Sequence, residues 1–195
     1  RRFITLLTEK GDVIEGQLSS KTLEATVGDR VLYDFLGDVP FVREIQAPRN
    51  ELTRSYRDQN RKIAANVDHL LIITAHGPTF NTISVDRMLA VASLQGIPTS
   101  LVVNKQDLQD PVAQELEGIY RSVGVQLFPA AIKQSIGIEP IEALLRVPSL
   151  KTVVLAGVSG VGKSTLLNKL IPGAAQRTNE VSERTGQGKQ TTTQP

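Results

Sequence analysis

The spacing of apolar residues changes along this chain and separates two regions. In residues 1–48, short stretches rich in β-branched and aromatic residues alternate with turn signals such as Lys10-Gly11-Asp12. They predict strands at residues 2–7, 13–18, 30–35 and 41–45. Strands of this length and spacing favour a small β-barrel with an OB-like fold. We expect the aromatic rings of this region to fill the barrel interior, with stacking on nucleotide bases as the alternative: Phe3, Tyr33, Phe35 and Phe41.

The second region, residues 65–195, alternates strand and helix patterns. Residues 67–75 form a continuous apolar run, typical of a strand buried on both faces. Further strands are predicted at residues 99–103, 125–127 and 151–156, and helices around residues 85–92, 112–123, 138–145 and 164–171. This alternation indicates an α/β domain with a mainly parallel sheet and helices on both faces. The helix at 112–123 should pack through one apolar face, made of Val112, Leu116, Ile119, Tyr120 and Val123.

Between the two regions, residues 49–64 contain five basic and two acidic residues, which predicts a basic linker. Two interpretations stay open for this stretch: a solvated connection, or a surface that contacts RNA phosphates. The formal net charge of the whole chain is only +2, so global charge does not favour nucleic-acid binding. The candidate RNA-binding residues are Arg49, Arg54, Arg57, Arg61 and Lys62.

A glycine-rich loop after the last predicted strand matches the spacing G-x-x-x-x-G-K-[ST]. In this motif backbone N–H groups surround phosphate oxygens, the lysine contacts the β- and γ-phosphates, and the hydroxyl binds Mg²⁺. Lys163 is therefore a candidate catalytic residue, and Ser164 is a candidate magnesium ligand. The predicted phosphate site comprises Gly157, Val158, Ser159, Gly160, Val161, Gly162, Lys163, Ser164 and Thr165.

A second motif, Asn104-Lys105-Gln106-Asp107, follows the strand at 99–103, at the edge of the sheet where α/β proteins bind ligands. The carboxylate of Asp107 can accept hydrogen bonds from the N1–H and N2 amino groups of guanine, whereas adenine presents a lone pair at N1. Lys105 can lie along the base plane, and Asn104 can connect this loop to the phosphate loop. We predict that all four residues, Gln106 included, bind GTP or GDP, and a P-loop ATPase is disfavoured.

Two further segments complete the candidate site. After the strand at 125–127, the loop at residues 128–133 is the candidate base loop, in which the backbone N–H of Ala131 would donate to guanine O6. An ordinary strand-to-helix connection is the alternative. The Thr-rich segment at 188–193 has the composition of a switch segment, with a polar tail as the alternative. We assign Thr192 as a catalytic residue and second Mg²⁺ ligand, although Thr191 and Thr193 fit the pattern equally well.

The composition excludes several other classes of protein. The chain has no cysteine, which argues against a disulfide-stabilised secreted fold and fits a reducing compartment. The apolar stretch around residues 70–73 is too short to span a bilayer. We therefore expect a cytoplasmic protein without a membrane partner, and nothing in the sequence requires more than a monomer.

The order of the motifs (base tetrad, base loop, phosphate loop, Thr-rich segment) resembles that of a circularly permuted GTPase. Together with Val27-Gly28-Asp29-Arg30-Val31, Pro48-Arg49-Asn50-Glu51-Leu52 and Ala65-Asn66-Val67-Asp68, it makes the chain similar to the ribosome small subunit-dependent GTPase family, RsgA or YjeQ. The resemblance implies an OB-fold, a permuted GTPase domain and a C-terminal zinc domain. It also implies GTP hydrolysis stimulated by the small ribosomal subunit and its rRNA, during late maturation of that subunit.

Two departures from the family pattern shape the expectations. The chain ends at Pro195 without the family's D-x-P-G motif, so we expect it to be part of a longer protein with an incomplete GTPase domain. Without cysteine, it cannot build a Cys/His zinc site of that kind, so Zn²⁺ is expected only in a C-terminal domain absent from this chain. The alternative function is an RNA- or ribosome-binding module with a guanine-nucleotide-gated site and negligible turnover.

Overall fold

The computed structural model describes residues 3–20, 22–56, 59–78 and 80–171. The chain divides into two compact units, with the boundary between Asn66 and Val67. Among the described helices, none has both the length and the apolar content needed to cross a bilayer. The Thr-rich segment with Thr192 lies outside the described residues, as does Arg57.

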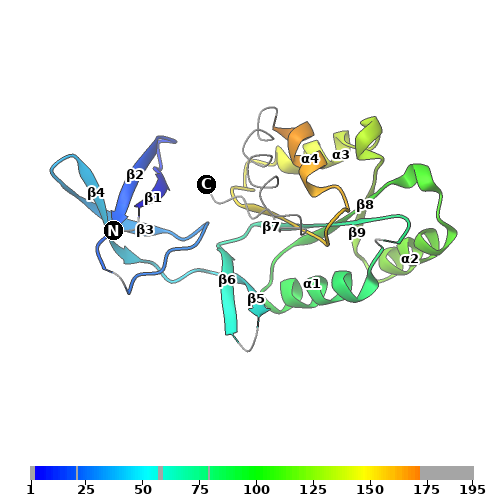
Figure 1. The fold of residues 1–195 in the computed structure, drawn as a ribbon, viewed down its shortest axis with the longest axis horizontal. Helices are drawn as coiled ribbons and strands as arrows, with labels where there is room; N and C mark the ends of the chain where they lie inside the picture. The colour runs from blue at the N-terminus through cyan, green and yellow to red at the C-terminus, as the bar shows by residue number, and fades with distance from the viewer. Residues whose placement is uncertain (1–2, 21, 57–58, 79, 172–195) are drawn as a thin grey trace, which may run out of the picture. The chain divides into compact units, whose positions relative to one another are not determined.

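The first unit contains the four strands that the sequence predicts. They are β1 (Phe3–Leu7), β2 (Val13–Leu18), β3 (Val31–Leu36) and β4 (Val39–Ile45), and they form one sheet in the order β1-β2-β4-β3. The β1–β2 and β3–β4 pairs are antiparallel, and β2 runs parallel to β4 (Figure 1). Leu6 and Val42 lie buried on one face of this sheet.

Most of the stretch at residues 49–64, which was assigned to a linker from its charges, lies in a β-hairpin over residues 51–65. Its strands are β5 (Glu51–Tyr56) and β6 (Gln59–Ala65), and a parallel bridge from Val27 to Ala64 connects it to the loop before β3. Leu52 and Ala64 are buried in the hairpin, whereas Arg54 and Arg61 are exposed. The linker prediction followed the basic residues and did not use these few apolar positions, through which the hairpin packs.

The expectation that aromatic rings fill the interior was wrong for two of them. Phe3 and Phe35 are each 64% exposed, while Tyr33 and Phe41 are half-buried. Alternation along β1 explains Phe3, because it shares a strand face with Leu7, which is also exposed, and lies opposite the buried Leu6. Phe35 makes an edge-on contact with Tyr33, with ring centroids 5.7 Å apart.

The second unit is a three-layer α/β domain. Its parallel sheet has the order β10-β7-β8-β9, with β7 (His69–Ala75), β8 (Thr99–Asn104), β9 (Gln126–Pro129) and β10 (Val153–Ala156). Helices α1 (Thr82–Leu94) and α2 (Pro111–Ser122) cover one face, and α3 (Glu139–Leu145) and α4 (Lys163–Leu170) cover the other (Figure 1). Short 3₁₀ turns η1 (Gln106–Leu108) and η2 (Ile132–Gln134) follow β8 and β9. The predicted α/β fold class is confirmed.

The core of the second unit forms around β7, whose seven residues are all buried, as its apolar run predicts. On one face of the sheet, Leu71, Ile73 and Ala75 pack in a cluster with Ile141 of α3 and Leu166 of α4. The carboxyl ends of the parallel strands, and the loops that follow them, therefore stand on a rigid layer.

The predicted apolar face of α2 was right for Tyr120, which is buried, but wrong for three of its other residues. Val112, Ile119 and Val123 are at least half exposed, and the helix buries Ala113 and Glu117 beside Tyr120. The tyrosine hydroxyl donates to Asp86 of α1 at 2.8 Å, and Glu117 has buried hydrogen-bond partners described below. Because the buried face of α2 includes the charged residue Glu117, it does not coincide with the face that the apolar residues mark.

Gly28→Ala should destabilise the first unit more than Gly37→Ala. Both glycines have positive φ, and a side chain in that region costs about 1–2 kcal/mol. A Cβ on Gly28 would also lie 2.0 Å from the carbonyl oxygen of Ala65, whereas Gly37 has no atom within 4 Å. Hydrogen exchange of the β4 and β6 amides should therefore show a loss of about 2–4 kcal/mol for Gly28→Ala. Equal losses in the two variants would contradict the close contact.

Candidate nucleotide site

Two glycines allow the loop between β10 and α4 to pack against the sheet. Gly157 has φ +149°, and a Cβ there would lie 2.2 Å from the carbonyl oxygen of Ile73 on β7. Gly162 has φ +106°, and a Cβ there would lie 2.3 Å from Nδ2 of Asn104. Because a side chain is excluded at both positions, the loop backbone can approach β7 and the end of β8 closely.

Lys163, the first residue of α4, places its ammonium group over this loop. Its Nζ donates to the carbonyl oxygens of Gly157 at 2.9 Å and Val158 at 2.8 Å. Burial lowers the pKa of Lys163 below its ordinary value. Ser164 and Thr165 are exposed in the first turn of the same helix, where unpaired N–H groups and the helix dipole favour an anion.

Asn104 connects the phosphate loop with the loop after β9. Its side chain is buried, and its Nδ2 donates to the carbonyl oxygen of Val161 at 2.7 Å. Its Oδ1 accepts from the backbone N–H of Ile132 at 3.0 Å. The predicted contact between the tetrad and the phosphate loop is confirmed. The same side chain also bonds η2, a contact that the sequence did not predict.

The tetrad and the residues directly after it form a tight turn with two strained residues. Lys105 has φ 59° and Gln109 has φ 46°, and a left-handed conformation costs a non-glycine residue about 1–2 kcal/mol. The backbone N–H of Gln106 donates to the carbonyl oxygen of Ala130 at 3.1 Å, which fixes the turn against β9. Such strain persists only where the surroundings determine the conformation, as they do here.

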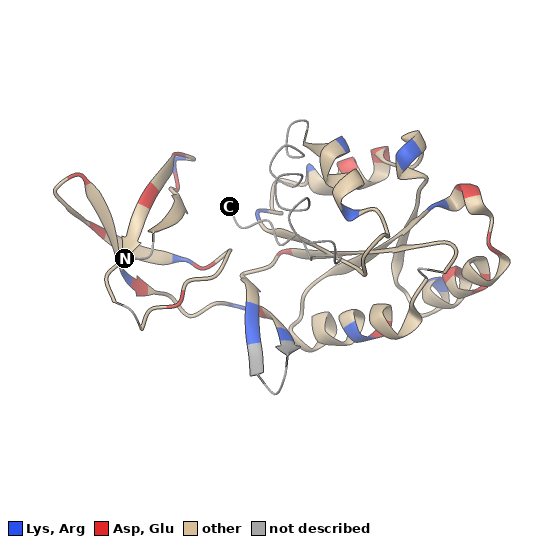
Figure 2. Cartoon of the chain, in the orientation of Figure 1, with Lys and Arg blue, Asp and Glu red and all other residues tan. Residues whose placement is uncertain are grey.

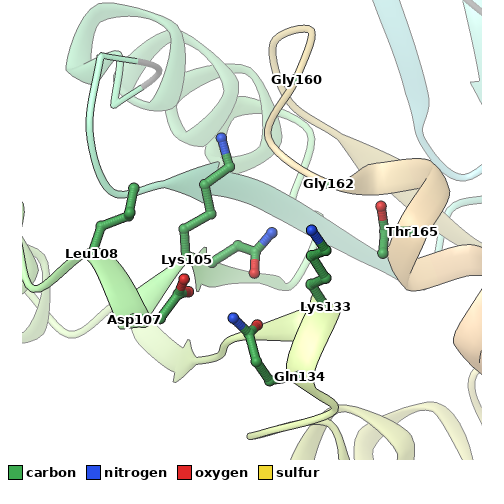
Figure 3. A pocket seen from close by; sticks show the side chains of 9 residues that line it. Lys105, Asp107, Leu108, Lys133, Gln134, Gly160, Gly162 and Thr165 are labelled. Atoms are coloured by element: carbon green, nitrogen blue, oxygen red, sulfur yellow. The ribbon is translucent and has the colours of Figure 1, made fainter.

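The described loops enclose a pocket of about 250 Å³ at the carboxyl end of the sheet. Three of the four tetrad residues line it, together with two phosphate-loop glycines and Thr165 (Figure 3). Two lining residues, Leu108 and Gln134, were missed from the sequence, and a third, Lys133, lies in the predicted base loop but was not assigned to the site. A polar pair in the loop after β9 was the available signal for Lys133 and Gln134, because that loop lies at the ligand-binding edge of the sheet.

Gln106 is the tetrad residue that does not line the pocket. Its side-chain amide instead donates to Oε1 of Glu117 at 2.6 Å, on α2 behind the turn. The structure therefore places Gln106 away from the surface that a base would contact, although the sequence grouped it with the nucleotide-binding residues.

The N–H of Ala131, the candidate donor to the base, has a protein acceptor. It donates to the carbonyl oxygen of Ile136 at 3.0 Å, and Ala131 is buried outside the pocket lining. In the same segment, the N–H groups of Ile132 and Gln134 donate to Asn104 and to the carbonyl oxygen of Ala131. A donor to a base would have to come from a neighbouring residue of this turn.

Basic residues lie along the β5–β6 hairpin of the first unit (Figure 2), and the contacts of the predicted RNA-binding residues differ from one another. Lys62 donates to Asp29 at 2.9 Å and to Glu51 at 2.8 Å. Burial alone would lower the pKa of Lys62, but the hydrogen bonds and charges of Glu51 and Asp29 raise it above its ordinary value. Arg49 donates to the backbone of Asn66 at 3.0 Å. Arg54 and Arg61 are exposed and lie directly opposite each other in the hairpin.

Comparison with known proteins identifies the family. The family model described as RsgA GTPase matches residues 45–195, more than half of the chain. The chain belongs to the RsgA GTPase family. The base tetrad precedes the phosphate loop in its sequence, the reverse of the usual GTPase order, and a related solved structure is described as a circularly permuted GTPase.

Individual members of the RsgA GTPase family match most of this chain. A Haemophilus influenzae protein named small ribosomal subunit biogenesis GTPase RsgA is 35% identical over 95% of this chain and 56% of its own length. A Burkholderia mallei protein of the same name is 34% identical over 99% of this chain and 62% of its own length. The chain thus spans a little over half the length of the curated RsgA relatives it matches.

Two solved structures share the fold. YjeQ from Thermotoga maritima aligns with a TM-score of 0.70 and 31% identity, covering 88% of this chain and 62% of that one. YloQ, the circularly permuted GTPase, aligns with a TM-score of 0.64 and 25% identity, covering 87% of this chain and 60% of that one. Both alignments include a strand-rich first region followed by the parallel sheet and its helices.

Asn104→Ala should weaken nucleotide binding as well as stability. The variant leaves the carbonyl of Val161 and the N–H of Ile132 without these partners. Each buried polar group left unsatisfied costs about 1–3 kcal/mol. We expect affinity for a fluorescent guanine nucleotide to fall by about 10- to 100-fold.

The matched control is Asn81→Ala, which removes the α1 cap bond to Ser84. It should reduce the free energy of unfolding by about 1 kcal/mol and leave nucleotide affinity unchanged. Equal effects of the two variants on affinity would contradict a specific role for Asn104.

Proposed function

We propose that this chain carries the nucleotide site of a GTPase that hydrolyses GTP to GDP and acts in maturation of the small ribosomal subunit. The observation that supports this most is the Asn104 bridge, which brings the base tetrad and the phosphate loop to one pocket. Names of the RsgA relatives support the biological setting, since they are called small ribosomal subunit biogenesis GTPases. Maturing subunits imply a cytoplasmic location, and a monomer suffices for the site.

In this proposal the base lies between the turns η1 and η2. Asp107 accepts hydrogen bonds from N1–H and the N2 amino group of guanine, while the Lys105 stem covers one side of the ring. The donor to O6 is the backbone N–H of Lys133 rather than that of Ala131. Lys133 lines the pocket, and the first N–H groups of a 3₁₀ turn have no acceptor within the turn.

The phosphates lie against the loop from Gly157 to Gly162 and the first turn of α4. The ammonium of Lys163 moves from the carbonyl oxygens of Gly157 and Val158 to the phosphate oxygens and stabilises the charge on the transferring group. These loop carbonyls hold the ammonium in position beforehand, which limits the reorganisation needed for binding.

The residues present fit Mg²⁺ bound by hydroxyl and phosphate oxygens. The exposed Ser164 hydroxyl is a hard oxygen ligand beside Lys163, and the described residues contain no cluster of three acidic or histidine side chains that would hold an ion by themselves. When bound, Mg²⁺ neutralises phosphate charge. Ser164 would hold it, with Thr192 as the proposed second hydroxyl ligand.

The hairpin β5–β6 is the proposed contact with rRNA. Arg54 and Arg61 are both exposed and face each other across the two strands, so two guanidinium groups stand on the surface of the hairpin. Guanidinium groups at a protein surface are suited to bind the phosphates of an RNA backbone. Lys62 and Arg49, which were also predicted to bind RNA, have partners within the unit and are assigned a structural role instead.

Asp107→Asn should change which nucleotide binds. An asparagine amide matches the 2-oxo group of xanthine in place of the 2-amino group of guanine, so preference should move from GDP to XDP by about 10²-fold or more. Competition of GDP, ADP and XDP against a fluorescent guanine nucleotide measures this. Asp86→Asn, on α1 and bonded to Tyr120, is the matched control and should keep the GDP preference. If ADP competes with GDP equally in the unaltered chain, guanine recognition is refuted.

Replacing Arg54 and Arg61 together by Gln should weaken binding to small ribosomal subunits by about 10-fold and reduce its salt dependence. Arg121 on α2 and Arg146, directly after α3, are both exposed. Replacing these two by Gln gives a control pair with the same charge change. Sedimentation with purified subunits at two salt concentrations measures both effects. Equal losses for the hairpin and control pairs would show that only net charge matters.

A further inference from the structure

A buried polar cluster lies directly behind the base pocket. His76, just after β7, is 0% exposed, and its Nε2 lies 2.7 Å from Oε1 of Glu117 on α2. The side-chain amide of Gln106 approaches the same oxygen at 2.6 Å. Three polar groups, from the residue after β7, from α2 and from the tetrad turn, thus meet inside the unit, where polar groups need partners.

The hydrogen bonds define which histidine nitrogen carries the proton. The backbone N–H of Asp110 donates to Nδ1 of His76 at 3.2 Å, so Nδ1 is the acceptor and Nε2–H donates to Glu117. The amide of Gln106 is the second donor to Oε1 of Glu117. The 3.2 Å separation between Gln106 Nε2 and His76 Nε2 is therefore that of two donors side by side on one carboxylate oxygen.

The same cluster fixes both ends of the tetrad turn. The backbone N–H of His76 donates to the carbonyl oxygen of Asn104 at 2.9 Å, at the start of the turn. At its end, Asp110 accepts from the N–H of Gly77 at 3.0 Å and bonds to the His76 ring. Gln106 holds the middle of the turn, next to Asp107. The strained residues Lys105 and Gln109 lie between these three attachments.

We propose that Gln106, Glu117 and His76 are positioning residues that set base specificity by holding the carboxylate of Asp107 in place. This inference rests on the proposed guanine site. Two hydrogen bonds from one edge of a base require a carboxylate with a fixed orientation, and the η1 backbone that carries Asp107 is fixed from behind by Gln106. None of the three positioning side chains lines the pocket, so each acts through Asp107 and not on the nucleotide.

Gln106→Met tests the proposal while it preserves the His76–Glu117 pair and therefore the packing of α2. The readout is the ratio of affinities for GDP and IDP, because IDP lacks only the 2-amino group that the second Asp107 bond recognises. We expect this ratio to fall about tenfold, the equivalent of one hydrogen bond. The matched control is Gln126→Met, which removes the part-buried hydrogen bond that Gln126 accepts from the Ser100 hydroxyl at 3.0 Å, at the opposite end of the sheet. It should leave the ratio unchanged.

Variants of Glu117 provide a second measurement. Glu117→Gln keeps an acceptor oxygen and should retain the GDP/IDP ratio within about threefold, whereas Glu117→Met should lower it as much as Gln106→Met does. A cluster that only stabilises the fold would lower the unfolding midpoint of these variants and leave the ratio untouched, which would overturn the inference. If the unaltered chain binds GDP and ADP alike, the proposed function falls together with the inference. If it prefers GDP while Gln106→Met keeps the full ratio, the inference alone falls.

Discussion

The buried amide of Asn104 is the interaction on which the nucleotide site depends. Strand order places β7 between β8, which carries the tetrad, and β10, which carries the phosphate loop. Neighbouring strands are about 4.8 Å apart, so the two loops start roughly 10 Å from each other. The phosphate loop closes this gap by packing against β7, which brings the carbonyl oxygen of Val161 within reach of the Asn104 amide, and the absence of a side chain at Gly162 leaves room for that amide. The other end of the amide bonds Ile132, in the turn after β9.

This bridge also explains how a permuted chain builds the same kind of site as an unpermuted one. The bond from Asn104 to Val161 joins residues 57 positions apart, and its geometry depends on strand order in the sheet rather than on the order of strands along the chain. A parallel sheet brings the carboxyl end of every strand to one edge, whichever strand comes first. Permutation therefore changes which segments continue from the site, not which residues meet there.

Local sequence patterns predicted the elements that depend on local chemistry. The apolar run of β7 and the spacing of the phosphate loop were sufficient because burial on both faces and backbone approach to an anion each demand particular residue types. The wrong face of α2 has a different cause: Glu117 is buried by partners at positions 76 and 106, and one sequence does not indicate such long-range pairs. The hairpin at residues 51–65 was missed for a similar reason, since Lys62 is neutralised by Asp29, more than thirty residues away.

Gln106 shows most clearly where the sequence is insufficient. The motif leaves this position open, and its neighbours Lys105 and Asp107 line the pocket, so grouping it with them was reasonable. Only the three-dimensional arrangement shows that its amide turns towards α2. The site is thus a front layer that meets the ligand and a rear layer that holds the front in position.

Hydrogen–deuterium exchange of the chain with and without GDP tests most directly whether the two loops form one site. If Asn104 couples them, GDP should protect amides in both the 104–108 and 131–134 turns and the 157–165 segment, with similar concentration dependence. In Asn104→Ala, the amides of the two turns and those of the 157–165 segment should no longer become protected at the same GDP concentrations. Protection confined to residues 157–165 in the unaltered chain would mean that a phosphate group binds without its base, and it would contradict the account.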